Sequence, residues 1–238
     1  MNSPVLWRDL KRFTPARVGL GRAGNGMPTT AHLAFQAAHA AARDAVHAEL
    51  DLAALQAALP RPARIVRSAC PDRRTYLLRP DLGRTLPPET TLTPIPGCTV
   101  LLICDGLSAT AVQRHAPAVI AALPADFPII IATQGRVALG DPIGAQLQAE
   151  AVIVLIGERP GLSSPDSLGA YLTWNPRPGR TDAERNCVSN IRAEGLPPIQ
   201  AALKIRWLLA EMTRLKLSGV ALKDEAPDQR SSTSVTAT

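Results

Sequence analysis

Polar residues whose types could do chemistry follow three short apolar segments, at residues 99–104, 128–132 and 151–156. These polar pairs are Asp105-Gly106, Gln134-Gly135 and Gly157-Glu158. If the segments are parallel strands, the pairs meet at the edge where open α/β sheets bind ligands. Asp105, Glu158 and Asp141 would then form a carboxylate cluster. Such a cluster could act as acid and base, but we favour helix capping and hydrogen bonding to ligand amides or backbone.

The other reactive residues do not form an evident, self-sufficient active site. The nucleophile motif G-x-S-x-G and the Walker A phosphate loop are absent from the sequence. His32, His39 and His47 lie near one helical stripe, but spacings of seven and eight residues favour a polar or interface stripe over a metal site. Cys187, close to Arg185, could be a nucleophile, although a small buried hydrophobe is the favoured interpretation. The residues therefore indicate a subunit that holds a ligand.

Residues 19–24 match the dinucleotide pattern G-x-G-x-x-G, and Asp44 follows the last glycine by twenty residues. A working fingerprint needs a buried strand before it and a helix that begins inside it. Only Ala16-Arg17-Val18 precedes the first glycine, and Asn25-Gly26-Met27-Pro28 follows the last. We therefore favour a flexible, arginine-bearing loop, with a stand-alone nucleotide-binding α/β enzyme as the alternative.

The elements that must position these residues alternate along the chain. Helical periodicity separates the three apolar segments, over residues 109–123 and 141–148. Asp141 is expected to cap the second of these helices, with Pro142 in its first position. Strand, helix, strand, helix, strand at this spacing predicts right-handed crossovers and a parallel sheet. The remaining expected elements are a strand at 167–174, a turn carrying Cys187 after residue 181, and an amphipathic helix at 198–217.

The sequence predicts three parts. Residues 1–62 form a small helical N-terminal domain, with a first helix around Trp7 and later helices at 31–50 and 51–59, the former capped by Thr29 or Thr30. Residues 63–218 form the α/β domain, in which 64–84 is mixed and only its first residues resemble a strand. Residues 219–238 are rich in Ser, Thr, Asp and Pro and are expected to be disordered.

Composition excludes several classes of protein. The 238 residues are 46% hydrophobic, enough for a sizeable core, but only 3% are aromatic, so base-stacking surfaces are disfavoured. The net charge of +6 is scattered without a long basic block, which argues against nucleic-acid binding. The four cysteines show no C-x-x-C spacing, so a reduced, cytoplasmic chain is expected. No apolar run approaches the ~20 residues that span a bilayer.

An ordered set of motifs resembles the small (light) subunit of ethanolamine ammonia-lyase over about residues 10–218. The shared motifs include Arg79-Pro80-Asp81-Leu82-Gly83-Arg84, Asp105-Gly106-Leu107-Ser108, Gly135-Arg136-Val137, Gly157-Glu158-Arg159-Pro160-Gly161-Leu162 and Cys187-Val188-Ser189-Asn190-Ile191. The resemblance implies a helical N-terminal part and a Rossmann-like, mostly parallel sheet with helices on both faces. It also implies an adenosylcobalamin-dependent lyase that converts ethanolamine to acetaldehyde and ammonia, in a complex with a large subunit that carries the catalytic residues.

The resemblance carries three cobalamin contacts over to this chain. Val137 matches the apolar position after Gly-Arg, Glu158 the Glu of Gly-Glu-Arg-Pro-Gly, and Cys187 the Cys before Val-Ser-Asn. A corrin is apolar in its plane and fringed with neutral amides, so Val137 can pack against it while Glu158 accepts from an amide. No D-x-H-x-x-G motif occurs, so we expect the cofactor to keep its own dimethylbenzimidazole on cobalt.

Two further expectations concern assembly. Some family members carry a longer N-terminal extension that suits packaging into a bacterial microcompartment, whereas this chain starts almost at the first shared helix. A free cytoplasmic complex is therefore as well supported as an encapsulated one. The helical N-terminus and the C-terminal amphipathic helix leave a pure assembly module as a further alternative to a cofactor-binding subunit.

Overall fold

A six-stranded sheet organises the computed structural model, which describes residues 9–10, 12–14 and 16–226. The strand order is β1-β3-β2-β4-β5-β6. The strands are β1 (Arg64–Arg67), β2 (Thr99–Cys104), β3 (Ile129–Thr133), β4 (Ala151–Gly157), β5 (Leu168–Trp174) and β6 (Arg185–Ile191). All seven residues of β4 are buried, as its continuous apolar sequence predicts for a strand covered on both faces.

The sheet is mixed, which corrects part of the expected architecture. Strands β1 to β4 pair in parallel, as predicted for β2, β3 and β4, and helices α5 and α6 connect these three strands. Strands β5 and β6 run antiparallel to their neighbours, because a loop without a helix joins β4 to β5 and a short loop joins β5 to β6. The expected turn around Cys187 was wrong, since its polar sequence forms β6.

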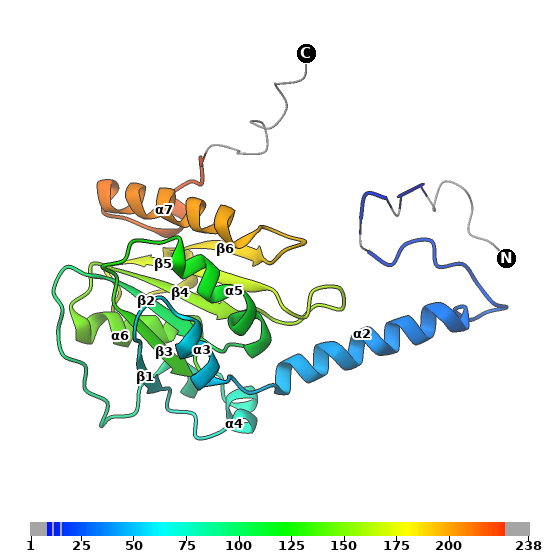
Figure 1. Ribbon diagram of the computed structural model, residues 1–238, viewed down its shortest axis with the longest axis horizontal. Helices are drawn as coiled ribbons and strands as arrows, with labels where there is room; N and C mark the ends of the chain where they lie inside the picture. The colour runs from blue at the N-terminus through cyan, green and yellow to red at the C-terminus, as the bar shows by residue number, and fades with distance from the viewer. Residues whose placement is uncertain (1–8, 11, 15, 227–238) are drawn as a thin grey trace, which may run out of the picture.

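Helices cover both faces of the sheet (Figure 1). On one face, α3 (Leu52–Ala58), α5 (Ala109–Ala121) and α7 (Pro198–Leu215) pack over a large apolar core. On the other face, α6 (Gly140–Leu147) packs over a smaller core that includes Val152 and Val154 of β4. The two cores alternate along β4, as side chains of a strand must.

The N-terminal helices do not share a core of their own in the described part of the chain. Helix α2 (Thr29–His47) extends away from the sheet in Figure 1 and buries only Ala45. Helix α3 instead joins the core of the sheet through Leu55. The structure thus shows two differently placed helices where a helical domain was predicted. Trp7, around which the first helix was predicted, lies outside the described residues.

Several local predictions were also corrected. Pro28, and neither Thr29 nor Thr30, precedes α2 as its cap. Asp141 lies within the first turn of α6 and is buried, so it does not cap that helix. An unpredicted helix, α4 (Arg73–Leu78), follows β1, and Asp72 caps it by accepting from the backbone N–H of Thr75 at 2.7 Å.

The packed chain extends beyond the predicted start of the tail. Gly219 and Leu222 are buried, and a short 3-10 helix, η4, spans Gly219–Ala221. Residues 227–238 of the predicted tail lie outside the described residues. Among the helices that the structure describes, none has the length and apolar character needed to cross a membrane.

Candidate functional site

The carboxyl ends of β2, β3 and β4 lie along one edge of the sheet, as predicted. The Asp105 carboxylate, just after β2, accepts hydrogen bonds from the backbone N–H groups of Gln134 at 2.9 Å and Gly135 at 3.1 Å, just after β3. The backbone N–H of Leu107 donates to the carbonyl of Gly157 at the end of β4, at 2.9 Å. These bonds join the three strand ends directly.

The part of this edge between β2 and β3 is where an α/β fold places a ligand. The chain leaves β2 toward α5 on one face and leaves β3 toward α6 on the other, so the two connections diverge and open a crevice. Here α4 fills it. The Arg73 guanidinium lies 3.6 Å from the Asp105 carboxylate and donates to the Gly106 carbonyl at 2.8 Å. The Tyr76 hydroxyl donates to the Gly135 carbonyl at 3.2 Å.

The charged and polar groups in this crevice act as a structural joint: they connect α4 and α2 to the sheet. Burial raises the pKa of Asp105 above its usual range, although backbone N–H groups and Arg73 oppose the rise. Burial also raises the pKa of Tyr76, whose ring is covered by the Arg136 guanidinium at 4.2 Å. Arg73 reaches on to the carbonyl of Val46 at 2.6 Å and so ties α2 to the sheet. These polar groups therefore bond one another across the crevice.

A second part of the same edge, over β4, β5 and β6, is open. Glu158 follows β4 and points to the face that α6 partly covers. One of its carboxylate oxygens accepts from the Ser167 hydroxyl at 2.5 Å and from the backbone N–H of Asn190 at 3.3 Å. The other oxygen lies over Gly169, where an added Cβ would come within 2.8 Å of it. Gly169 therefore makes the space that the Glu158 side chain occupies.

Tyr171 and Cys187 lie next to each other on this face, paired across β5 and β6. Cys187 is exposed and Tyr171 half-buried. Burial raises the pKa of the Cys187 thiol; a hydrogen bond from Tyr171 opposes the rise, and the Glu158 charge adds to it. Burial raises the Tyr171 pKa as well, with contributions from Cys187 and Glu158. The three side chains thus share one electrostatic environment.

Val137 approaches this face from a short 3-10 helix, η2 (Val137–Leu139), that leads into α6. It is half-buried and packs, like Tyr171, against the core under α6. The three residues taken from sequence, Val137, Glu158 and Cys187, therefore lie on the same side of the sheet. Sequence reasoning missed Tyr171, because the segment of Cys187 was expected to be a turn and the pairing of the two residues was hidden.

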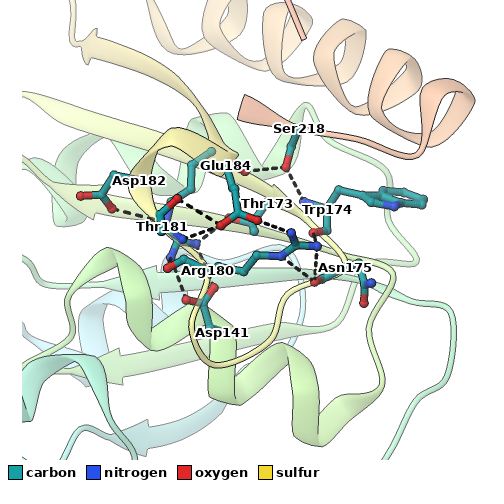
Figure 2. A network of polar contacts seen from close by, with 10 residues as sticks. Asp141, Thr173, Trp174, Asn175, Arg180, Thr181, Asp182, Glu184 and Ser218 are labelled. Carbon is teal, nitrogen blue, oxygen red and sulfur yellow. Dashed lines mark hydrogen bonds and ion pairs between the residues drawn. The ribbon is translucent and has the colours of Figure 1, made fainter. Parts of the chain in front are cut away.

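Asp141 is not part of a carboxylate cluster with Asp105 and Glu158. Its carboxylate receives two hydrogen bonds from the buried Arg185 guanidinium, at 2.8 and 2.7 Å. Arg185 also donates to the Thr173 hydroxyl at 2.9 Å. Figure 2 shows the same network continuing into the loop before β6, where Arg180 pairs with Glu184. This network fixes α6 to β5 and β6, and so sets the border of the open face.

The chemistry that the open face offers is limited. It offers a carboxylate that is already positioned, a phenol, a protonated thiol and apolar side chains, none arranged as a nucleophile with its base. No group of three or more His, Cys, Asp or Glu residues that could hold a metal ion occurs in the described ranges. Fold and site together define an α/β protein with a mixed sheet and an exposed face over β4 to β6.

Comparison with known proteins names the family. The chain belongs to the ethanolamine ammonia-lyase light chain (EutC) family, whose model matches residues 5–223. It is 55% identical over 239 residues to the ethanolamine ammonia-lyase small subunit of Xanthomonas campestris pv. campestris (strain B100), which covers 92% of this chain and 88% of that protein. The small subunit of Rhodopseudomonas palustris (strain BisA53) is 56% identical over 235 residues, 92% of this chain and 90% of the relative. That of Bradyrhizobium diazoefficiens is 52% identical over 250 residues, 96% of each chain. The chain is thus a subunit of a lyase complex.

Proposed function

We propose that this subunit holds adenosylcobalamin at an interface with the large subunit of ethanolamine ammonia-lyase, which converts ethanolamine to acetaldehyde and ammonia. The proposal is carried by one observation: Glu158, Tyr171 and Cys187 gather on an open face of the sheet that has no catalytic constellation of its own. Such a face suits one half of a socket, with the other half supplied by a partner.

The residues present fit a corrin. Its broad apolar plane suits Val137 and the half-buried ring of Tyr171, and its neutral amide side chains suit a carboxylate acceptor. Glu158 is already held by Ser167 and Asn190, so little conformational freedom is lost when an amide N–H reaches its remaining lone pairs. The absence of a Cβ at Gly169 keeps that carboxylate in place.

In this proposal the cofactor, when bound, supplies the radical chemistry, and the residues of this chain bind and orient it. Glu158 would accept a hydrogen bond from a corrin amide, and Val137 and the neutral thiol of Cys187 would pack against the cofactor. The acid–base and substrate-binding residues belong to the large subunit. The proposal also keeps the predicted domain boundary near residue 62. It places the complex either free in the cytoplasm or inside a bacterial microcompartment.

Reconstitution tests the division of labour. The purified chain alone should not deaminate ethanolamine, whereas addition of the large subunit and adenosylcobalamin should give turnover, measured as acetaldehyde released. Turnover by this chain without a large subunit would refute the proposal.

A variant of Glu158 separates a cofactor-binding subunit from a pure assembly module. Glu158→Ala should weaken binding of cobalamin to the complex by about 1–3 kcal/mol, because a buried polar partner loses its acceptor. Assembly with the large subunit, followed by size-exclusion chromatography, should be unchanged. Unchanged cofactor affinity in an assembled complex would favour the assembly module.

A further inference from the structure

The N-terminal arm, residues 9–47, carries exposed apolar side chains and forms no core of its own among the described residues. Helix α2 leads away from the sheet (Figure 1), and among its residues only Ala45 is buried. Leu33, within α2, is 57% exposed. Apolar surface that gathers on one segment in this way indicates a protein–protein contact. The large exposed hydrophobic side chains of the arm are Leu10, Phe13, Met27 and Leu33.

Contacts on both sides of α2 connect the arm to the rest of the protein. At the end of the helix, the Arg73 guanidinium donates to the carbonyl of Val46 at 2.6 Å. Before the helix, the Arg17 guanidinium donates to the carbonyl of Leu162 at 3.5 Å. Leu162 belongs to the loop between β4 and β5, which begins at Glu158. The arm therefore meets the same loop that carries Glu158 of the open face.

The charges of the arm indicate the kind of partner that it fits. Residues 29–42, with which α2 begins, include no Asp, Glu, Lys or Arg. The whole arm has four Arg and one Lys against two Asp, so its net charge is positive. Two copies of the arm would therefore repel each other, whereas an apolar groove bordered by carboxylates would attract it. Helices bind partner grooves through apolar anchors of the kind that Leu33 provides.

We propose that the N-terminal arm docks on the large subunit, in an apolar groove bordered by acidic residues, with Leu33 buried at the contact. The inference rests on the proposed function for its partner, but not for the cofactor. The chain is a subunit of a lyase complex, and a partner that closes the open face lies next to the loop that the arm meets. The arm is then a second contact between the subunits, one that needs no cobalamin.

The test measures association of the full chain with the large subunit in the absence of cobalamin, by biolayer interferometry. Leu33→Glu places a charge at the proposed contact, and Leu33→Met keeps an apolar side chain of similar size. Leu203→Glu is the matched control, because Leu203 is also an exposed leucine on a helix, α7, outside the arm. Since both leucines are exposed, neither charged variant should shift the thermal unfolding of the isolated chain by more than about 2 °C.

Leu33→Glu should weaken association by about tenfold or more, since its charge would lose water in the groove, and the other two variants by less than about twofold. Raising NaCl from about 50 to about 300 mM should weaken wild-type association by about threefold, because the arm is basic. Unchanged association of Leu33→Glu with the large subunit would overturn the inference. If that variant instead loses self-association of the isolated chain, the arm binds a second copy, which also overturns it. A wild-type complex that assembles but binds no cobalamin would refute the proposed function and leave this inference standing.

Discussion

One part of the sheet edge is closed by a helix in this protein, and another part is open. At the crevice between β2 and β3, α4 inserts Arg73 and Tyr76, and every carboxylate oxygen of Asp105 has a partner. Over β4, β5 and β6, no helix from the described residues is inserted beside Glu158 and Tyr171, and Cys187 is exposed. The usual ligand position of an α/β fold is thus closed by the chain, and the face proposed for the cofactor lies further along the edge.

The antiparallel strands explain why the face over β4, β5 and β6 is open. Because β5 turns back directly after β4 and β6 pairs with it, the described chain has no crossover helix between β4 and β5. The face beside α6 is left open where a fully parallel sheet would be covered. Closure of one part stabilises the fold, and openness of the other leaves room for the cofactor in the proposed function. Substitutions in the two parts should therefore have separable effects on unfolding and on cofactor affinity.

The largest effect is expected from opening the closed part. Arg73→Met leaves Asp105 as an unpaired buried charge and should lower the free energy of unfolding by about 3–4 kcal/mol. Urea denaturation of the full chain measures it, and Arg74→Met, at the exposed neighbouring arginine, should change stability by less than about 0.5 kcal/mol. An Arg73→Met chain as stable as wild type would show that the crevice is not a structural joint.

A smaller change at the open part should act on binding. Gly169→Ala would place a methyl group 2.8 Å from the Glu158 carboxylate and displace it. We expect a stability loss of about 1–2 kcal/mol and a roughly tenfold weaker cofactor affinity in the complex. Gly97→Ala is the control: it strains a backbone with φ of +74° in open space, far from Glu158 in sequence, and should cost stability without loss of affinity. Equal affinities for the two variants would argue against Glu158 as a contact.

The loop between β4 and β5 offers a test through pH. Burial tends to raise the pKa of Asp166, but the hydrogen bond from Arg114 at 2.9 Å and the nearby His115 lower it below its usual range. A depressed carboxyl pKa adds stability above its unfolded value, near 4, and this stability is lost as pH falls through the folded value. Asp166→Asn should thus lose about 1 kcal/mol at pH 7 and converge with wild type in acid.

Thermal unfolding between neutral pH and pH 3 measures this difference for Asp166→Asn. Asp126→Asn serves as the control, because Asp126 is exposed. A constant gap between Asp166→Asn and wild type at every pH would show that the ion pairs of Asp166 do not hold the loop.

The smallest effect concerns the proximity of Glu158 and Cys187. The Glu158 charge adds to the burial that raises the pKa of the Cys187 thiol, so less thiolate is present at pH 8. Glu158→Gln should therefore speed alkylation of Cys187 by iodoacetamide about two- to threefold, as followed by mass spectrometry of the modified peptide. The rate at the half-buried Cys98 provides the internal control. Equal rates at Cys187 in both proteins would place the two groups too far apart to interact.

The sequence predicted the parallel part of the sheet and the meeting of its strand ends, because apolar runs and helical periods are local signals. It did not predict β6, since Arg185 and Asn186 are polar and their burial depends on partners elsewhere, such as Asp141 for Arg185. The short α4 was missed for a similar reason. Its role follows from the long-range contacts of Arg73 with Asp105 and Val46, which spacing along the chain does not reveal.

The central claim is that the face over β4 to β6 is one half of a cobalamin socket. A cryo-electron microscopy structure of the complex of this chain with the large subunit and adenosylcobalamin tests it most directly. The account predicts a corrin amide at hydrogen-bond distance, about 3 Å, from the Glu158 carboxylate, with Val137 and Cys187 against the same ring. A corrin bound with Glu158, Val137 and Cys187 all facing solvent or the large subunit, out of contact with the cofactor, would contradict it.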